Sequence, residues 1–142
     1  MYEVYTDGSC LGNPGRGGWA AISSDFRLCG SQPNTTNNVM EMTAIIKALE
    51  QCLWMEKTCV CIITDSNYVK NGITTWIHNW KKNGWKTANG ADVKNKEVWT
   101  KMDELRQKIT MIEWRWVKAH NGNAQNEAVD KLARECAKNL SE

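Results

Sequence analysis

The chain has 142 residues, of which 42% are hydrophobic and 24% are charged, and its formal net charge is +2. These values are typical of one globular domain over residues 1–142, and they exclude a long low-complexity or disordered chain. No apolar run approaches the ~20 residues that a membrane span requires, so we expect no membrane partner.

The first third of the chain has the pattern of an antiparallel β-meander. Apolar and polar residues alternate from Tyr2 to Asp7, and the segments GGWAAIS and LCGS add two short strands. Because strand-like sequence begins directly after Met1, we expect no secretory signal and a cytoplasmic location. The stretch GSCLGNPGRGG lacks the ending of a P-loop and the spacing of a dinucleotide fold, so we interpret it as a hairpin turn.

The middle of the chain predicts a helix and then a buried strand. Apolar residues recur at helical spacing from Met40 to Cys52, and a Thr/Asn cluster precedes them as a cap. The segment TCVCIITD is continuously apolar and β-branched, which is typical of a strand covered on both faces, and it ends at Asp65. The segment SNYVKNG predicts a short helix that ends at Gly72.

The remaining sequence predicts two helices, a strand and a closing helix. TTWIHNWKKNGWK is amphipathic and ends at Gly84, KNKEVWTKMDELRQKI forms the next helix, and MIEWRWVKAH returns to a strand. The last helix places Ala128, Leu132, Cys136 and Leu140 on one apolar stripe. The order β-β-β-α-β-α-α-α-β-α favours an α/β fold in which helices flank a mixed sheet.

The six cysteines allow a disulfide framework, but their positions favour free thiols. Cys52, Cys59, Cys61 and Cys136 lie in apolar periodic segments, and the sequence has no CxxC pair and no zinc-finger spacing. We therefore expect buried free cysteines.

Four acidic residues break the local pattern in which they lie. Asp7 and Asp65 end strands, Glu41 lies on the buried flank of its helix, and Asp130 lies near the apolar stripe of the last helix. A buried carboxylate is costly unless its charge is compensated, and Glu41 has no lysine or arginine at helical spacing on its own face. Strand ends and helix faces converge on one cleft in an open α/β sheet. All-oxygen ligands suit Mg²⁺ or Mn²⁺ better than zinc, so we expect the four acids to bind a divalent cation.

Each of these residues also has a plainer interpretation. Asp7 and Asp65 lie in TDG and TDS, which are ordinary turn-capping sequences, and Asp130 alone is compatible with a surface residue. His120 lies in a polar loop with glycine, where it is either solvated or available for proton transfer beside the acids. His78 lies in the tryptophan-rich helix and is interpreted as structural.

Five segments together resemble bacterial type 1 ribonuclease H. They are TDGSCLGNPG, TTNNVMEMTAIIKALE, TDSNYV, GITTWIHNWKKNGWKTA and VKAHNGNAQNEAVDKLAR, and they follow the family's order over essentially the whole chain. The resemblance implies a ribonuclease H-like fold, with a five-stranded mixed sheet of an antiparallel meander plus parallel strands, flanked by helices. It also implies an endonuclease that hydrolyses the RNA strand of RNA/DNA hybrids and leaves a 5′-phosphate and a 3′-hydroxyl.

The resemblance assigns a catalytic role to five residues. Asp7, Glu41, Asp65 and Asp130 match the metal-binding carboxylates, and His120 matches a histidine that assists proton transfer or product release. Two Mg²⁺ ions ~4 Å apart, for which Mn²⁺ can substitute, would activate the attacking water and stabilise the leaving 3′-oxygen during in-line cleavage. The expected partner is the RNA/DNA hybrid, and the expected oligomeric state is a monomer.

The resemblance also places polar side chains against both strands of the hybrid. The residues assigned to the 2′-hydroxyls in the minor groove are Cys10, Asn13, Asn37, Asn38 and Asn67. The best-known bacterial members usually have glutamine where this chain has Asn67, so the shorter amide alters that contact. Thr36 and Asn95 are assigned to a pocket for a phosphate of the DNA strand.

Positive charge is concentrated between Lys81 and Lys101, where six lysines accompany two acids. By the resemblance, residues 75–95 are the family's basic protrusion, the handle. Trp76, Lys81, Lys82 and Trp85 are expected to bind the duplex without reading its sequence, with an affinity that falls as salt rises. Trp80 and Trp99 are expected to pack the handle on the core. The alternative is that these lysines are only solvated surface.

Two other functions belong to different classes. A hybrid-binding module that has lost hydrolysis predicts a missing acid, whereas all four acids are present. An integrase-like enzyme of the same superfold usually has three acids and lacks the segments GWKTA and VKAHNGN, which this chain contains.

Overall fold

Five strands form one mixed sheet in the computed structural model, which describes residues 1–119 and 121–139. The strands are β1 (Tyr2–Leu11), β2 (Gly15–Ile22), β3 (Arg27–Thr35), β4 (Cys59–Thr64) and β5 (Met111–Trp116). Their order across the sheet is β3-β2-β1-β4-β5. β1, β2 and β3 pair antiparallel, whereas β4 pairs parallel with both β1 and β5. The predicted meander with added parallel strands is therefore confirmed.

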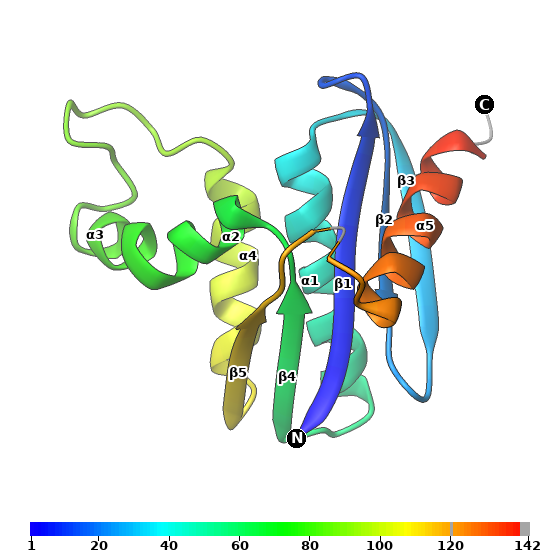
Figure 1. Ribbon diagram of the computed structural model, residues 1–142. Coiled ribbons are helices and arrows are strands. Elements are labelled where there is room, and N and C mark those ends of the chain that lie inside the picture. The colour runs from blue at the N-terminus through cyan, green and yellow to red at the C-terminus, as the bar shows by residue number, and fades with distance from the viewer. Residues whose placement is uncertain (120, 140–142) are drawn as a thin grey trace.

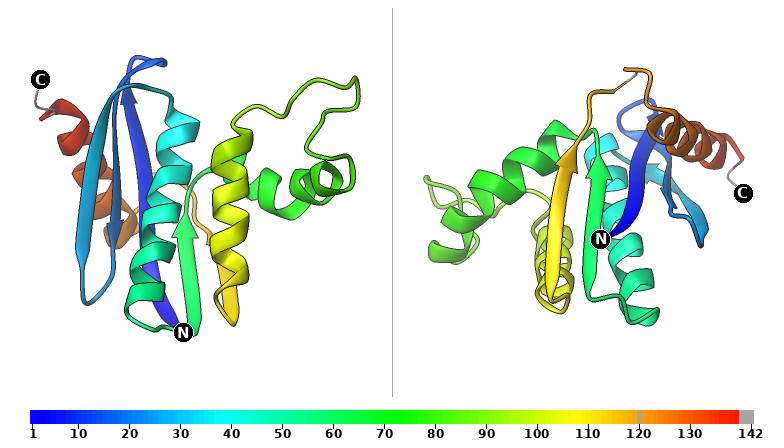
Figure 2. Two further views of the ribbon diagram at one scale, coloured as in Figure 1. Left: turned by 180° about the vertical axis from the view of Figure 1, so that it is seen from behind. Right: turned by 60° about the horizontal axis from the view of Figure 1, so that its bottom comes forward.

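Helices cover both faces of this sheet. The helical elements are α1 (Asn37–Trp54), α2 (Asn67–Asn71), the π-helical segment η1 (Gly72–Trp76), α3 (Ile77–Lys82), α4 (Lys96–Gln107) and α5 (Ala124–Lys138). α1 and α4 lie on one face, and α5 lies on the opposite face over β1, β2 and β3 (Figures 1 and 2). None of the helices in residues 1–119 and 121–139 is long and apolar enough to cross a membrane.

The larger hydrophobic core lies between the sheet and the helices α1 and α4. Its members include side chains from both sides of this layer, namely Val4, Ile45, Leu49, Val60, Ile62, Trp99 and Met102. A second cluster under α5 contains Ala20, Val129, Leu132 and Ala133. β4 is covered over most of its length, as its continuous apolar sequence predicts. The two cores fix the central strands whose ends carry the candidate site.

The prediction that Gly72 ends a helix is wrong, because the chain continues through η1 into α3. Gly72 has helical dihedral angles, and a Cβ added there would lie 2.0 Å from the ring of Trp99. Gly72 therefore provides room for a buried tryptophan from α4. Gly84 has a positive φ of 62° two residues after α3, in agreement with its predicted role as a helix stop.

The predicted buried stripe of the last helix is only partly correct. Leu132 is buried and Cys136 is half-buried, but Ala128 is exposed, and Leu140 lies outside the described residues. The helix turns Ala133 and Ala137 toward the sheet, where a Cβ at Gly18 would lie 2.3 Å from the Ala133 carbonyl oxygen. Small residues on both sides thus let α5 approach β2 closely, and this approach sets the rotation of the helix.

The expectation of buried free cysteines is also partly wrong. Cys29 of β3 and Cys136 of α5 form a disulfide with a Cα–Cα distance of 6.5 Å. Cys52 and Cys61 are buried free thiols as predicted, whereas Cys59 is free but exposed. The disulfide partners are 107 residues apart and meet only because α5 packs on the edge of the sheet.

Candidate active site

Asp7 lies within the central strand β1, opposite Ala20 of β2. The prediction that Asp7 ends its strand is wrong, because the pairing with β2 carries β1 on to Leu11. Its side chain is only 3% exposed, and its Oδ2 atom has no hydrogen-bond partner within the described part of the chain. A buried carboxylate oxygen without a donor is costly, because it loses water without gaining a substitute. The buried carboxylate of Asp7 would therefore be stabilised by a bound group that compensates its charge.

Glu41 reaches Asp7 from the first turns of α1. Thr36 caps this helix by accepting from the Val39 N–H, and Glu41 follows Met40, which is fully buried. The Gly8 N–H donates to Glu41 Oε1 at 2.5 Å. A Cβ at Gly8 would lie 2.3 Å from the Glu41 nitrogen, so this contact between strand and helix requires glycine. Gly8 could not be recognised from the sequence, where it lies within the segment TDGS and resembles an ordinary turn glycine.

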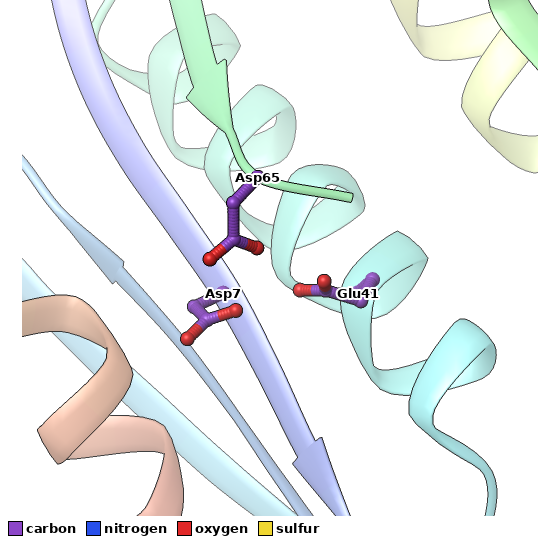
Figure 3. Close-up of side chains that lie close together, drawn as sticks. All are labelled: Asp7, Glu41 and Asp65. Carbon is purple, nitrogen blue, oxygen red and sulfur yellow. The ribbon is translucent and has the colours of Figure 1, made fainter. Parts of the chain in front are cut away.

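Asp65 joins these residues from the end of β4. The chain turns directly after it, where Ser66 caps α2 by accepting from the Val69 N–H. Asp7, Glu41 and Asp65 each offer one carboxylate oxygen, and these oxygens lie within 4.8 Å of one another. Figure 3 shows the three side chains pointing toward a common space from β1, α1 and the end of β4. We call this group the acidic centre.

The electrostatics of the acidic centre are unfavourable without a cation. Burial raises the pKa of Asp7, and the charges of Glu41 and Asp65 raise it further. Burial also raises the pKa of Glu41, although hydrogen bonds with Asp7 and Gly8 lower it in part. Among the described residues, no lysine or arginine forms an ion pair with the three acids. The oxygen-only donor set and the unsatisfied Asp7 Oδ2 fit a hard divalent cation.

Asp130 lies next to the acidic centre but is not one of its three converging members. It contacts Asp7 closely enough to contribute to the raised pKa of Asp7. Its Oδ2 accepts from Arg134 Nε at 3.1 Å, which is an ion pair within α5. The structure thus brings together three of the four predicted acids and places the fourth at their edge. His120, the fifth residue predicted to be catalytic, lies outside the described residues.

Four of the residues assigned to the minor groove, Cys10, Asn13, Asn37 and Asn38, lie at the β1–β2 hairpin and the start of α1, whereas Asn67 begins α2 after Asp65. Asn13 Oδ1 accepts from the Asn37 N–H at 3.2 Å, and this bond joins the hairpin to the helix. The thiol of Cys10 lies 3.4 Å from the Thr35 carbonyl oxygen. Asn37 is exposed and Asn38 is half-buried, so both side chains border the surface beside Glu41.

Thr36 and Asn95 precede two helices, α1 and α4, that pack against each other. Thr36 caps α1, as described above. Asn95 precedes α4 with a positive φ of 61°, and its amide donates to the Tyr68 hydroxyl at 3.2 Å. The amide of Asn95 is therefore held in place by Tyr68 of α2.

The predicted handle contains a chain of aromatic contacts. Trp80 lies 5.9 Å from Trp76, 6.2 Å from Trp85 and 5.5 Å from Trp99 between ring centroids. Trp99 is fully buried and Trp80 packs against the core, in agreement with their predicted structural roles. Trp76 and Trp85, which each contact Trp80, are both half-buried.

Two handle lysines differ in their surroundings. Lys81 Nζ lies 3.1 Å from Asp103 Oδ2, a buried carboxylate of α4, so this amine anchors α3 to the core. Lys82 is exposed, and no acid among the described residues pairs with it. Of the two lysines, Lys82 is therefore the one whose charge no described carboxylate neutralises.

Comparisons with known proteins agree with this architecture. The family model described as RNase H matches residues 1–138. Ribonuclease H of Anaplasma marginale (strain St. Maries) is 51% identical over 137 residues, which cover 92% of this chain and 86% of that protein. Ribonuclease H of Ehrlichia ruminantium (strain Gardel) is 52% identical over 136 residues, which cover 92% and 90%.

A solved structure extends the comparison to three dimensions. LC9-RNase H1, a type 1 RNase H with the type 2 active-site motif, superposes with a TM-score of 0.82 at 33% identity. The match covers 98% of this chain and 72% of that chain. The fold and these relatives define the protein as a nuclease, a hydrolase of nucleic acids. The chain belongs to the RNase H family.

Proposed function

We propose that this chain is an endonuclease that hydrolyses the RNA strand of RNA/DNA hybrids, with Mg²⁺ as its cofactor, and leaves 5′-phosphate and 3′-hydroxyl ends. The observation that carries the proposal is the convergence of Asp7, Glu41 and Asp65, with one buried oxygen that no described residue satisfies. Relatives named Ribonuclease H, about half identical over most of the chain, support the substrate class.

The proposed metal ligands are Asp7, Glu41, Asp65 and Asp130, which would hold two Mg²⁺ ions, with Mn²⁺ as a substitute. When bound, such ions lower the pKa of a water nucleophile and stabilise the leaving 3′-oxygen. The chain itself contributes the rigid placement of the carboxylates. Gly8 holds Glu41 by a backbone hydrogen bond, and the burial of Asp7 keeps bulk water from screening its charge. His120 is proposed to assist proton transfer or product release.

Substrate selection is proposed to take place on the surface beside Glu41. Cys10, Asn13, Asn37, Asn38 and Asn67 are short polar residues that suit the 2′-hydroxyls in the wide minor groove. The hydrogen bond between Asn13 and Asn37 supports this proposal, because it holds the hairpin and the helix start as one surface.

The proposed contacts to the DNA strand come from helix starts and from the handle. Thr36 and Asn95 are proposed to bind a phosphate, and Trp76, Lys82 and Trp85 to contact the backbone. Lys81 is proposed to attract the DNA backbone with its positive charge, while its amine stays paired with Asp103. Such contacts position a duplex without reading its sequence, so cleavage should tolerate many sequences. The monomeric state and the cytoplasmic location stay predictions from the sequence.

The test is cleavage of an end-labelled RNA/DNA hybrid, with RNA/RNA and DNA/DNA duplexes of the same sequence as controls. We expect the hybrid alone to be cut in Mg²⁺, and cutting to stop in EDTA or in the variant Asp7→Asn. Persistent cleavage in EDTA would overturn the metal-dependent mechanism, and equal cutting of RNA/RNA would overturn the substrate choice. Tight hybrid binding without cleavage would favour the binding-module alternative.

A further inference from the structure

A pocket of about 420 Å³ lies beside Asp65, on the side of β4 that faces β5. Its walls come from the start of α2 and from the segment that follows β5, which Figure 1 shows running past the end of β4. The Val117 N–H donates to the Thr64 carbonyl at 3.0 Å and fixes these two segments together. The pocket therefore shares Asp65 with the acidic centre but opens on its other side.

The lining of this pocket is basic. Lys70 of α2 and Lys118 of the segment after β5 are both exposed, and neither pairs with an acid among the residues that the structure describes. By contrast, Lys81, Lys86 and Lys101 each pair with a carboxylate. Two unpaired amines that line one pocket suit an anion.

Uncharged groups complete the pocket. Asn67 contributes an amide, and the half-buried ring of Trp116 contributes an apolar wall that stacks on Trp114 at a centroid distance of 6.1 Å. This combination of two amines, an amide and an aromatic surface complements a phosphodiester with its attached sugar. The acid that lines the pocket is Asp65, which the proposed function assigns to the metal.

We propose that Lys70 and Lys118 form a subsite for a backbone phosphate of the RNA strand, one or two nucleotides from the bond that is cut. This inference rests on the proposed function, which places the scissile phosphate at the acidic centre. Phosphates of one strand recur every ~3.4 Å along a duplex axis, so the phosphate that reaches a pocket bordering Asp65 is close to the scissile one. The subsite holds the RNA strand in register at the acidic centre.

The first experiment compares Lys70→Gln, Lys118→Gln and the double variant with Lys108→Gln. Lys108 follows α4 at the opposite end of β5 and is an exposed lysine without an ion pair among the described residues, so it is a matched control. Hybrid binding is measured by fluorescence anisotropy in EDTA, over a series of salt concentrations. We expect the double variant to bind about fivefold more weakly at low salt, with a log–log salt slope shallower by about 0.9. Thermal melting confirms that each variant is folded.

The second experiment locates the phosphate. Hybrids carry one uncharged methylphosphonate at successive positions of the RNA strand, each on a 2′-O-methyl nucleotide, and the charged 2′-O-methyl strand is the reference. We expect one position near the cut where the uncharged linkage weakens binding by the wild type but not by the double variant. A second series in the DNA strand should show no such position.

The outcomes separate this inference from the proposed function. If the wild type cuts the hybrid, and the double variant binds and cuts like Lys108→Gln, the subsite is refuted while the proposed function stands. The subsite is also refuted if no RNA position shows a methylphosphonate effect that is present in the wild type and absent in the double variant. It is refuted as well if such a position lies in the DNA strand. If the wild type cuts no hybrid in Mg²⁺, the proposed function fails and the RNA-strand subsite that depends on it fails as well.

Discussion

Removing one charge from the acidic centre should stabilise the metal-free protein. The three carboxylates lie within 4.8 Å of one another, and Asp7 Oδ2 has no donor among the described residues. The raised pKa values of Asp7 and Glu41 mean that the folded chain binds more protons than the unfolded chain. The free energy of unfolding therefore falls as pH rises above the ordinary carboxyl pKa of ~4. The variant Asp7→Asn removes the part of this loss that comes from Asp7 and from its repulsion of Glu41 and Asp65.

The magnitude follows from the distances. Two charges 4.8 Å apart repel by about 3.5 kcal/mol at an effective dielectric constant of about 20, and Asp7 takes part in two such pairs. The wild type can avoid this repulsion by keeping one carboxyl protonated. For a carboxyl of ordinary pKa, binding the proton at pH 7.5 costs about 5 kcal/mol, and this sets the upper limit of the destabilisation. The buried amide that replaces the Asp7 carboxylate would still lack a partner at the Oδ2 position, which costs about 2 kcal/mol and offsets part of this gain. We therefore expect Asp7→Asn to raise the free energy of unfolding by about 3 kcal/mol and Tm by roughly 10 °C.

The assay is thermal melting in EDTA at pH 7.5 and at pH 4, with Glu104→Gln as the control. Glu104 is an exposed acid of α4, so its replacement should leave Tm nearly unchanged. The advantage of Asp7→Asn should become small at pH 4, close to the ordinary carboxyl pKa, because protonating a carboxyl then costs little. It should also disappear in Mg²⁺, which compensates the charge. An Asp7→Asn variant that melts below the wild type in EDTA at pH 7.5 would refute this reasoning.

Three further predictions concern other contacts. Gly8→Ala should lower the free energy of unfolding by about 3 kcal/mol and abolish hybrid cleavage, because the added Cβ would overlap the backbone of α1 at Glu41. A fully active Gly8→Ala variant would contradict the close contact between β1 and α1. Cys29→Ser should lower the free energy of unfolding in urea by about 2–4 kcal/mol, whereas Cys59→Ser should not; equal effects would argue against the disulfide. Mg²⁺ at about 100 times its Kd should stabilise the wild type by about 2.7 kcal/mol but stabilise Asp65→Asn much less, as measured by melting; an equal gain in both would place the ion elsewhere.

Most of the fold follows from patterns that are local in the sequence. The alternation that leads to Asp7, the helical period around Glu41 and the apolar run before Asp65 are short-range signals, and a strand, a helix and a strand formed there. The end of the first strand was predicted wrongly, because β1 continues past Asp7 to Leu11. The convergence of the three acids was also predicted, but for a partly different reason. Asp65 follows the end of β4, whereas Asp7 lies inside β1 and is level with Asp65 because the two strands run parallel with Tyr5 opposite Ile63.

The features that could not be predicted depend on contacts between distant segments. Nothing near Cys29 identifies Cys136 as its partner, since the two meet only after α5 packs on β3. Gly72 resembles a helix stop until Trp99 of α4 is seen to occupy the space of its absent side chain. The rotation of α5 likewise depends on its close approach to Gly18.

The basic pocket beside Asp65 was missed for the same reason. Lys70 and Lys118 lie in separate segments, and the sequence directs attention to the denser lysines of the handle. Their common pocket appears only when the segment after β5 is hydrogen-bonded to the end of β4. The signal in the sequence was weak, with one lysine in each of the segments SNYVK and VKAH.

The central claim is that the acidic centre binds divalent cations, and anomalous scattering from crystals soaked in Mn²⁺ tests it most directly. We expect Mn²⁺ density in contact with carboxylate oxygens of Asp7, Glu41 and Asp65, and loss of that density in Asp7→Asn. Crystals that show Mn²⁺ only at other positions, or none at a concentration that supports hybrid cleavage, would contradict it.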